Sequence, residues 1–314
     1  MNKLYLVVPC YNEQEVLPET SKRLLKKVSD LIVENRISPE SRIVFVDDGS
    51  KDDTWNIIEG LHGQNPVFQG IKLSRNKGHQ NALLAGLMTV KEHCDTAISL
   101  DADLQDDTDA IDEMLLRYEE GCEVVYGVRS SRKTDSFFKK STALLFYKLM
   151  SCMGVETVYN HADYRLMSKR ALESMEKFSE VNLFLRGIVP LIGFKSTTVS
   201  YKREKRFAGE SKYPLKKMLS FAWDGITSFS VKPIKMISFV GALSLFAGIC
   251  MLLTLFVLFL CGREFGDKIF YTALACALIP YRFFLSTGIV GEYIGKTYME
   301  SKHRPRYIIE TYLK

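Results

Sequence analysis

Short apolar runs and longer amphipathic stretches take turns along the first two thirds of the chain. The apolar runs, rich in β-branched residues, are residues 4–9, 42–48, 68–74, 96–101 and 123–128. Helices are predicted between them, over residues 14–35, 52–63, 79–92 and 109–119. Strands that alternate with helices in this way form parallel sheets covered by helices. The pattern therefore predicts an α/β domain with a mostly parallel sheet.

The pattern changes near residue 232, after which charged residues become rare. Residues 237–261 carry no charge, and residues 269–291 carry only Arg282. A helix needs about 20 apolar residues to cross the hydrocarbon core of a bilayer. A buried core hairpin is the alternative, but a globular core rarely uses so long an uncharged run. The two segments therefore predict a hairpin of transmembrane helices.

Charged residues around this hairpin predict its orientation. The connector GREFGDK has no net charge. Basic residues lie outside both helices: Lys232, Lys235, Lys296, Lys302, Arg304 and Arg306. Segments rich in Lys and Arg stay on the cytoplasmic side of a membrane. We therefore expect a multi-pass protein of the cell membrane whose large N-terminal part and both termini are cytoplasmic.

An amphipathic segment precedes the hairpin. Pro214 suits the first turn of a helix. The apolar residues that follow share one helical stripe: Leu215, Met218, Leu219, Ala222, Ile226 and Phe229. Such a helix is expected to lie in the membrane interface. The predicted organisation is a cytoplasmic domain over residues 1–211, an interfacial helix over 212–232, two transmembrane helices within 233–295, and a cytoplasmic tail over 296–314.

Composition narrows the range of partners. The 314 residues include 42 Lys and Arg against 37 Asp and Glu, a net charge of +5. This balance is too weakly basic to indicate nucleic-acid binding. The seven cysteines are scattered and include no CxxC pair. They predict reduced thiols in a cytosolic environment, neither a disulfide framework nor a zinc site.

Four polar clusters follow four of the predicted strands. PCYNE ends the first strand, DDGSKDDT the second, SRNKGHQ the third and DADLQDD the fourth. In open α/β sheets, ligands bind at the carboxyl ends of the strands. One cluster alone would be an ordinary turn. Four clusters of acids, amides and lysine at one edge predict a binding site.

The fourth cluster concentrates negative charge. Asp101 and Asp103 end the strand, and Gln105 adds a neutral oxygen. Neighbouring carboxylates repel one another unless a cation lies among them. Oxygen ligands suit Mg²⁺ or Mn²⁺, which also binds phosphates. Asp106 and Asp107 have a plainer explanation, because they precede a predicted helix whose N-terminus favours acids.

The order of motifs resembles a known family. VVPCYNE, FVDDGSKDDT, RNKGHQNALLAG, DADLQD, YRLMSKRA and RFAGESKYPLKKML look like family 2 glycosyltransferases, which have the Rossmann-like GT-A fold. RFAGESKY before a membrane hairpin is most similar to the polyprenyl-phosphate glycosyltransferase branch, which includes dolichyl-phosphate mannose synthases and bactoprenol glucosyltransferases. The resemblance covers nearly the whole chain.

This resemblance implies a site for a nucleotide-sugar donor. The residues implied to contact the nucleotide are Pro9, Tyr11, Asn12, Glu13, Asp48, Lys77, Gly78, Asp101, Ala102 and Asp103. Asp101 would support the ribose or a metal ion, and Asp103 with Gln105 would hold Mg²⁺ or Mn²⁺ on the diphosphate. The ion's charge would stabilise the departing nucleoside diphosphate.

Further residues are implied to serve the acceptor. Arg129 would clamp a phosphate, although both Arg129 and Arg132 also fit solvated loop charges. Asp163, in NHADYRLM, matches the family's acid near the reacting centre, with Ala162 where the family usually has glycine.

Arg206, Ser211 and Lys212 would bind the lipid phosphate just before the membrane. The basic stretch 202–217 around them also fits simple attraction to lipid headgroups. The set expected at the reacting centre is thus Asp101, Arg129, Asp163, Arg206, Ser211 and Lys212.

The implied reaction is transfer of a sugar from a nucleotide sugar, with UDP-glucose or UDP-N-acetylglucosamine expected, to undecaprenyl phosphate. It would be an inverting in-line displacement that supplies sugar for cell-envelope glycans. A phosphate monoester is largely deprotonated at neutral pH, so it needs a general base less than a hydroxyl does. Asp163 is expected to orient the acceptor, to counter positive charge on the sugar, or to act as the base.

Other interpretations stay open. One is a mannose synthase that uses GDP-mannose, and another is a non-enzymatic, membrane-tethered protein that binds nucleotide sugars. A processive polysaccharide synthase would be expected to carry Arg before Trp, and neither Trp55 nor Trp223 follows an arginine. A homo-oligomer is compatible with the sequence.

Overall fold

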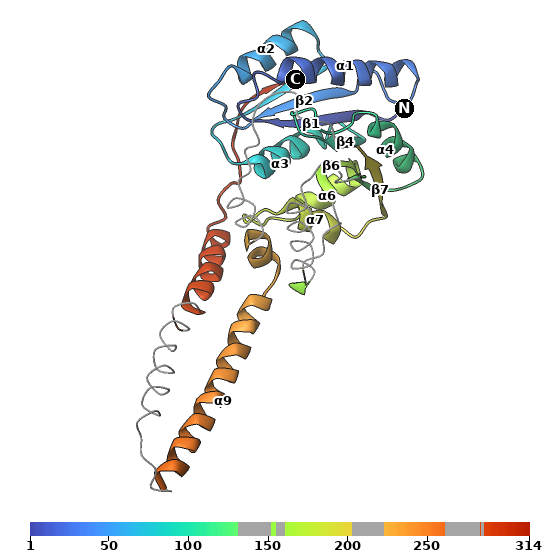
Figure 1. Ribbon diagram of the computed structural model, residues 1–314. Coiled ribbons are helices and arrows are strands. Elements are labelled where there is room, and N and C mark those ends of the chain that lie inside the picture. The colour runs from blue at the N-terminus through green and yellow to red at the C-terminus, as the bar shows by residue number, and fades with distance from the viewer. Residues whose placement is uncertain (131–151, 155–160, 203–222, 261–282, 284–285) are drawn as a thin grey trace.

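The computed structural model describes residues 1–130, 152–154, 161–202, 223–260, 283 and 286–314. Figure 1 shows an α/β head, which holds both termini, and two helical segments that extend from it. The extension contains α9 (Lys232–Leu260) and a helix over residues 286–301.

The head is built on one sheet with the strand order β7-β5-β6-β4-β1-β2-β3-β8. The strands are β1 (Leu4–Cys10), β2 (Arg42–Asp47), β3 (Phe68–Leu73), β4 (Thr96–Ser99), β5 (Val124–Arg129), β6 (His161–Ser168), β7 (Ser196–Tyr201) and β8 (Ile309–Leu313). Strands β1 to β4 are parallel to one another, and β7 is parallel to β5. β6 runs antiparallel between β4 and β5, and β8 runs antiparallel to β3. The predicted α/β class with a mostly parallel sheet is confirmed, and the sheet is mixed.

Helices cover both faces of this sheet. They are α1 (Leu17–Val33), α2 (Thr54–Gln64), α3 (His79–Val90), α4 (Ala110–Glu119), α6 (Lys169–Glu176) and α7 (Leu185–Leu191). Helices α1, α2 and α4 share one apolar core with Leu4 and Leu6 of β1. Helices α3, α6 and α7 share a second core with Tyr5 and Val7 of the same strand. β1 is therefore buried on both faces, which explains its unbroken apolar run.

The five predicted strands and four predicted helices correspond to β1–β5 and α1–α4. Strands β6, β7 and β8 are additional to the predicted ones. β8 lies inside the segment 296–314 that was expected to be a tail. Within this segment β8 pairs antiparallel with β3 and so extends the sheet, and the Tyr312 hydroxyl donates to Gln69 Oε1 at 3.2 Å.

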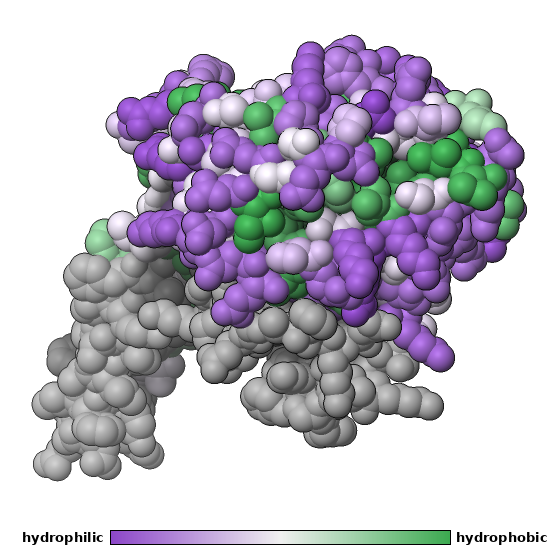
Figure 2. Space-filling view, turned by 90° about the horizontal axis from the view of Figure 1, so that it is seen from above, coloured by the Kyte–Doolittle hydropathy of each residue, from purple (hydrophilic) through white to green (hydrophobic). Residues whose placement is uncertain are grey.

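The extension differs from the head in the side chains that it exposes. Seen from above, the head is mainly hydrophilic, with scattered hydrophobic side chains (Figure 2). By contrast, α9 exposes several large apolar side chains: Phe239, Leu243, Phe246, Leu253 and Phe256.

Within the part of the chain that the structure describes, no single helix is both long and apolar enough to cross a membrane. One bent pair of helices is so when taken together: Trp223–Phe229 and Lys232–Ser244, at 87° to each other. Residues 269–282 and 284–285 of the expected second span, 269–291, and residues 212–222 of the expected interfacial helix, 212–232, lie outside the described residues. The transmembrane hairpin stays a prediction.

Candidate active site

The loops after β1 and β2 are bonded to each other. Asn12 adopts a left-handed backbone conformation, with φ of 51°. Its backbone N–H donates to Ser50 Oγ at 3.0 Å, and its side-chain Oδ1 accepts from the N–H of Lys51 at 2.9 Å. The N–H of Glu13 donates to Thr54 Oγ1 at 2.9 Å. Two of the four polar clusters therefore form one ordered rim.

Asp48 fixes the start of α3. It is buried, and its two carboxylate oxygens accept from the backbone N–H groups of Lys77, at 2.7 Å, and Gly78, at 2.9 Å. Gly78 has φ of 86°, a conformation that glycine adopts at little cost. Burial raises the pKa of Asp48, and the two N–H groups oppose that rise. The expected nucleotide residues Asp48, Lys77 and Gly78 thus lie together, whereas Pro9 is buried within β1.

The acidic cluster follows β4. Asp103 is buried, and its Oδ1 accepts from the N–H of Gln105 at 3.2 Å. The carbonyl of Ala102 accepts from Thr20 Oγ1 at 2.7 Å, which ties the cluster to α1. Burial raises the pKa of Asp101, and the negative charge of Asp103 adds to this rise. The structure therefore holds several carboxylates close together.

Asp106 belongs to this cluster, unlike the helix-start role expected for it. It is buried, and its Oδ1 accepts from the Tyr201 hydroxyl of β7 at 2.6 Å. Burial, with the charge of Asp101, raises the pKa of Asp106 to about 7. Asp107 does match the expectation, because its Oδ1 accepts from the N–H of Asp109 just before α4.

Two observations fit a divalent cation at this edge. Burial and the negative charge of Asp103 raise the pKa of Asp101, and burial and the charge of Asp101 raise the pKa of Asp106. The second oxygen of Asp106, Oδ2, is buried without a hydrogen-bond partner among the described residues. Hard cations take oxygen ligands of this kind. No group of three or more His, Cys, Asp or Glu side chains in the described ranges is arranged to hold an ion by itself. An ion here would therefore need further ligands, such as phosphate oxygens.

Asp163, on β6, is surrounded by cationic side chains. Its Oδ1 accepts from Arg165 Nη2 at 2.7 Å, and its Oδ2 accepts from Arg186 Nη2 at 3.1 Å. His79 Nε2 lies 3.5 Å from Asp163 Oδ2 and 3.7 Å from Asp101 Oδ1. Burial alone would raise the pKa of Asp163, but the cations outweigh it and hold that pKa well below its usual range.

His79 joins the two carboxylate groups of the site. Burial lowers the pKa of its imidazole, but the bond to Asp163 and the charge of Asp101 outweigh burial and raise the pKa to about 9. The imidazolium is therefore the main form at neutral pH. The cations His79, Arg165 and Arg186 were not among the expected site residues. The motif RNKGHQ contains His79, but only the fold brings it to Asp163 near the start of β6.

Arg129 ends β5 and faces the same cluster. Its charge lowers the pKa of Asp101 and of Asp106, and it hydrogen-bonds to the Tyr201 side chain. This placement differs from a solvated loop charge. Arg132, Arg206, Ser211 and Lys212 lie outside the described residues.

Comparison with known proteins gives the class. The profile of glycosyl transferase family 2 matches residues 5–175, which run from β1 into α6. The chain therefore belongs to glycosyl transferase family 2 and is an enzyme of that family.

Two relatives extend the match beyond the family profile. The chain is 35% identical over 321 residues to the bactoprenol glucosyl transferase of Shigella phage SfV, and the aligned region covers 98% of each protein. It is 52% identical over 313 residues to the uncharacterized glycosyltransferase YkoT of Bacillus subtilis, which covers 98% of this chain and 91% of the relative. The chain is thus related to bactoprenol glucosyl transferases along its whole length.

Solved structures are more distant. Glucosyl-3-phosphoglycerate synthase from Mycobacterium tuberculosis, in complex with Mn²⁺, UDP-glucose and phosphoglyceric acid, is 16% identical with a TM-score of 0.43, and covers 72% of this chain and 78% of its own. The mannosyltransferase PcManGT from Pyrobaculum calidifontis, in complex with GDP-mannose and Mn²⁺, is 14% identical with a TM-score of 0.43, and covers 95% of this chain and 88% of its own.

Proposed function

We propose that this enzyme transfers a sugar from a nucleotide sugar, UDP-glucose or UDP-N-acetylglucosamine, to undecaprenyl phosphate, with inversion at the anomeric carbon. The observation that carries the proposal is the joining of the acidic cluster to Asp163 through His79. This contact supports a site in which the acidic cluster would hold a metal diphosphate and Asp163 would lie near the reacting centre. Full-length similarity to a bactoprenol glucosyl transferase supports the acceptor.

The four polar clusters would form the part of the site that binds the nucleotide-sugar donor. The rim built on Asn12 and Glu13, and the loop held by Asp48, would bind the nucleoside. Asp103 and Gln105, with Asp101, would hold Mg²⁺ or Mn²⁺ on the diphosphate. When bound, the ion would supply positive charge to the leaving nucleoside diphosphate.

Asp163 is better suited to positioning than to proton transfer. A carboxylate whose pKa is held well below its usual range is a weak base at neutral pH. The acceptor phosphate is already largely ionised. We therefore assign Asp163 to orienting its cationic partners and to countering positive charge on the sugar, and Arg129 to contact with a phosphate.

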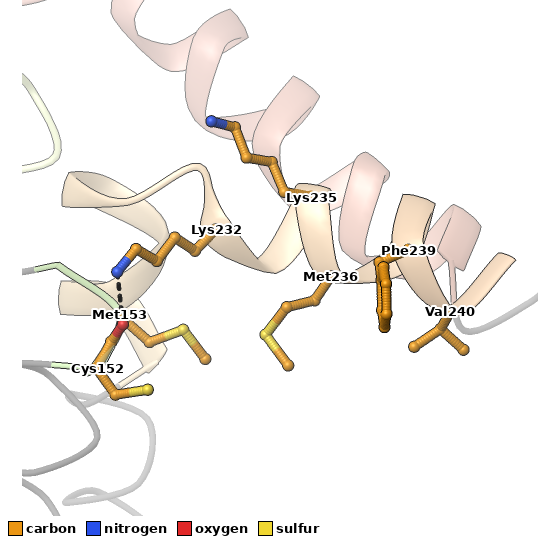
Figure 3. A pocket seen from close by; sticks show the side chains of 7 residues that line it. All are labelled: Cys152, Met153, Lys232, Lys235, Met236, Phe239 and Val240. Carbon is orange, nitrogen blue, oxygen red and sulfur yellow. Dashed lines mark hydrogen bonds between the residues drawn. The ribbon is translucent and has the colours of Figure 1, made fainter. Parts of the chain in front are cut away.

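The part of the site that binds the acceptor would lie nearer the membrane, where Arg206, Ser211 and Lys212 would bind the lipid phosphate. An open pocket of about 410 Å³ lies beside the first turns of α9. Figure 3 shows its lining of Cys152, Met153, Lys232, Lys235, Met236, Phe239 and Val240. Lys232 Nζ donates to the carbonyl of Cys152 at 2.7 Å, while Lys235 points away from that carbonyl.

The organisation proposed for the chain follows the same division. Residues 1–211 would form the cytoplasmic catalytic domain and residues 233–295 the membrane hairpin, with 212–232 in the interface. The exposed apolar side chains of α9 support an anchor in the cell membrane. Strand β8 would return the C-terminus to the cytoplasmic domain, which is compatible with both termini on one side.

Product analysis tests the proposal. The purified enzyme, given undecaprenyl phosphate, Mg²⁺ or Mn²⁺ and each of a panel of UDP- and GDP-sugars, should form one prenyl-phosphate sugar that mass spectrometry identifies. A product only from GDP-mannose would replace the proposed donor with that of a mannose synthase. Binding of a nucleotide sugar without any product would instead count against undecaprenyl phosphate as the acceptor.

A further inference from the structure

The helix over residues 286–301 ends against the loop that leads into α7. Glu300 Oε2 accepts a hydrogen bond from the backbone N–H of Val181 at 2.8 Å. Its Oε1 accepts from the backbone N–H and from the side-chain amide of Asn182, each at 2.8 Å. Hydrogen bonds to an ionised acceptor are stronger than neutral ones. Three of them on one carboxylate make this a specific attachment.

Other contacts hold the same loop. The Asn182 side chain also donates to the carbonyl of Lys296 at 3.4 Å, and Arg306 Nη1 donates to the carbonyl of Phe178 at 3.0 Å. A carboxylate in the last turn of a helix is disfavoured by the helix dipole, so the N–H donors must offset that effect at Glu300. The segment between the predicted hairpin and β8 thus contacts this loop at two places, through Glu300 and through Arg306.

The loop that Glu300 contacts is followed within a few residues by side chains of the candidate active site. The backbone N–H of Leu185 donates to Gln80 Oε1 at 2.8 Å, beside His79 at the start of α3. The next residue, Arg186, contacts Asp163 through Nε at 3.3 Å and Nη2 at 3.1 Å. A shift of the loop would therefore move Arg186 away from Asp163.

We propose that Glu300 is a positioning residue, which holds Val181 and Asn182 and thereby sets Arg186 on Asp163. This inference rests on the proposed function, because that function places Asp163 at the reacting centre. It makes sugar transfer depend on a part of the chain that follows the predicted membrane hairpin.

Kinetics of the full-length enzyme in detergent test the role. Glu300→Ala should lower kcat about 10- to 100-fold, the size expected for lost hydrogen bonds to a charged group, while the donor KM changes less than about twofold. The kcat of Glu300→Gln should lie between those of the wild type and Glu300→Ala, because the one carbonyl oxygen of glutamine can keep only part of the contacts. Glu292→Gln is the matched control: it lies on the same helix, where Glu292 faces Lys296 at 3.9 Å, and should keep normal kinetics.

A double-mutant cycle separates positioning from general destabilisation. If Glu300 acts through Arg186, the effects of Glu300→Ala and Arg186→Ala on kcat should be clearly less than additive. Fully additive effects, or normal kinetics in Glu300→Ala, would overturn the inference.

Hydrogen exchange gives a readout that does not need activity. Glu300→Ala should speed exchange of the amides from Val181 through Arg186, whereas Glu292→Gln should not. Faster exchange that stops at Asn182 would overturn the inference. If the wild-type enzyme forms no product from any donor, the proposed function fails, and exchange alone then decides whether Glu300 positions α7.

Discussion

Asp163 contacts three cationic side chains, and these contacts decide which chemistry it can perform. Arg165 is buried and donates to Asp163, Arg186 donates to it from α7, and His79 Nε2 lies near both Asp163 and Asp101. Such a carboxylate stays ionised well below neutral pH. It can orient charged partners and stabilise positive charge, but it gains little by taking a proton.

Asp103→Asn tests the metal assignment at the same scale. The change keeps the size of the side chain and removes one charge from the proposed ligand set, so transfer should fall about 100-fold or more. Chelator should inhibit the wild-type enzyme, and Mg²⁺ or Mn²⁺ should restore it. Transfer assays with and without chelator measure both effects. Full activity of the variant, or of the wild type in excess chelator, would contradict the assignment.

Asp106→Asn should stabilise the protein in chelator at neutral and alkaline pH. The pKa of Asp106 is raised from 3.8 to about 7, so the folded state binds this proton more tightly than the unfolded state. Stability is therefore lost as pH rises from about 4 through about 7. The variant avoids that loss, so its Tm should exceed that of the wild type by about 2–4 °C for each kcal/mol regained. Thermal unfolding at pH 4 and pH 8 checks this, and an equal gain at both values would speak against it.

At the scale of elements, β8 closes the β3 edge of the sheet. Truncation after Ile308 removes β8 and uncovers the unpaired N–H and C=O groups of β3. We expect a Tm lower by several degrees, at about 2–4 °C per kcal/mol, together with aggregation. As a control, Glu310→Gln removes only an exposed ion pair with Lys72, worth less than about 1 kcal/mol. An unchanged Tm after truncation would show that β8 adds nothing to stability.

The basic segment before the membrane calls for a kinetic test. If Lys212 binds the lipid phosphate, Lys212→Ala should lose about 1.5–3 kcal/mol, or roughly 10- to 150-fold in kcat/KM for the acceptor. Nucleotide-sugar binding, followed by calorimetry, should stay normal. Lys216→Ala is the control from the same segment and should change little in detergent with a short-chain prenyl phosphate. Loss of nucleotide binding in Lys212→Ala would move this residue to the part of the site that binds the donor.

For the whole molecule, the proposed anchor predicts behaviour in membrane fractions. The uncharged run 237–261 is long enough for a span, and α9 exposes large apolar side chains. The full-length protein should stay with membranes during alkaline carbonate washing, and a protease on the cytoplasmic side should reach both termini. Immunoblots of the washed and supernatant fractions measure this. Release of the full-length chain would contradict the hairpin.

Much of the head was predictable because its signals are local. The apolar run of β1 is buried on both faces, so burial leaves a mark on consecutive residues. The polar clusters directly follow parallel strands, whose carboxyl ends meet at one edge of the sheet. Their proximity could therefore be predicted, as the contact between Asp48 and Gly78 illustrates. The charge density of DADLQDD likewise indicates oxygen ligands without any knowledge of the fold.

The remaining features depend on long-range contacts, which leave no periodic trace in the chain. β8 lies more than two hundred residues from β3, and its pairing partner follows from topology alone. Asp106 has the sequence context of a helix start. Only the hydrogen bond from the Tyr201 hydroxyl of β7 shows that it belongs to the acidic cluster. The sequence by itself therefore determined the α/β class, the edge of the sheet at which the polar clusters meet, and the acidic character of that edge. The tertiary structure decided which cations surround Asp163 and where the C-terminal segment attaches, because burial and charge pairing depend on distances in space.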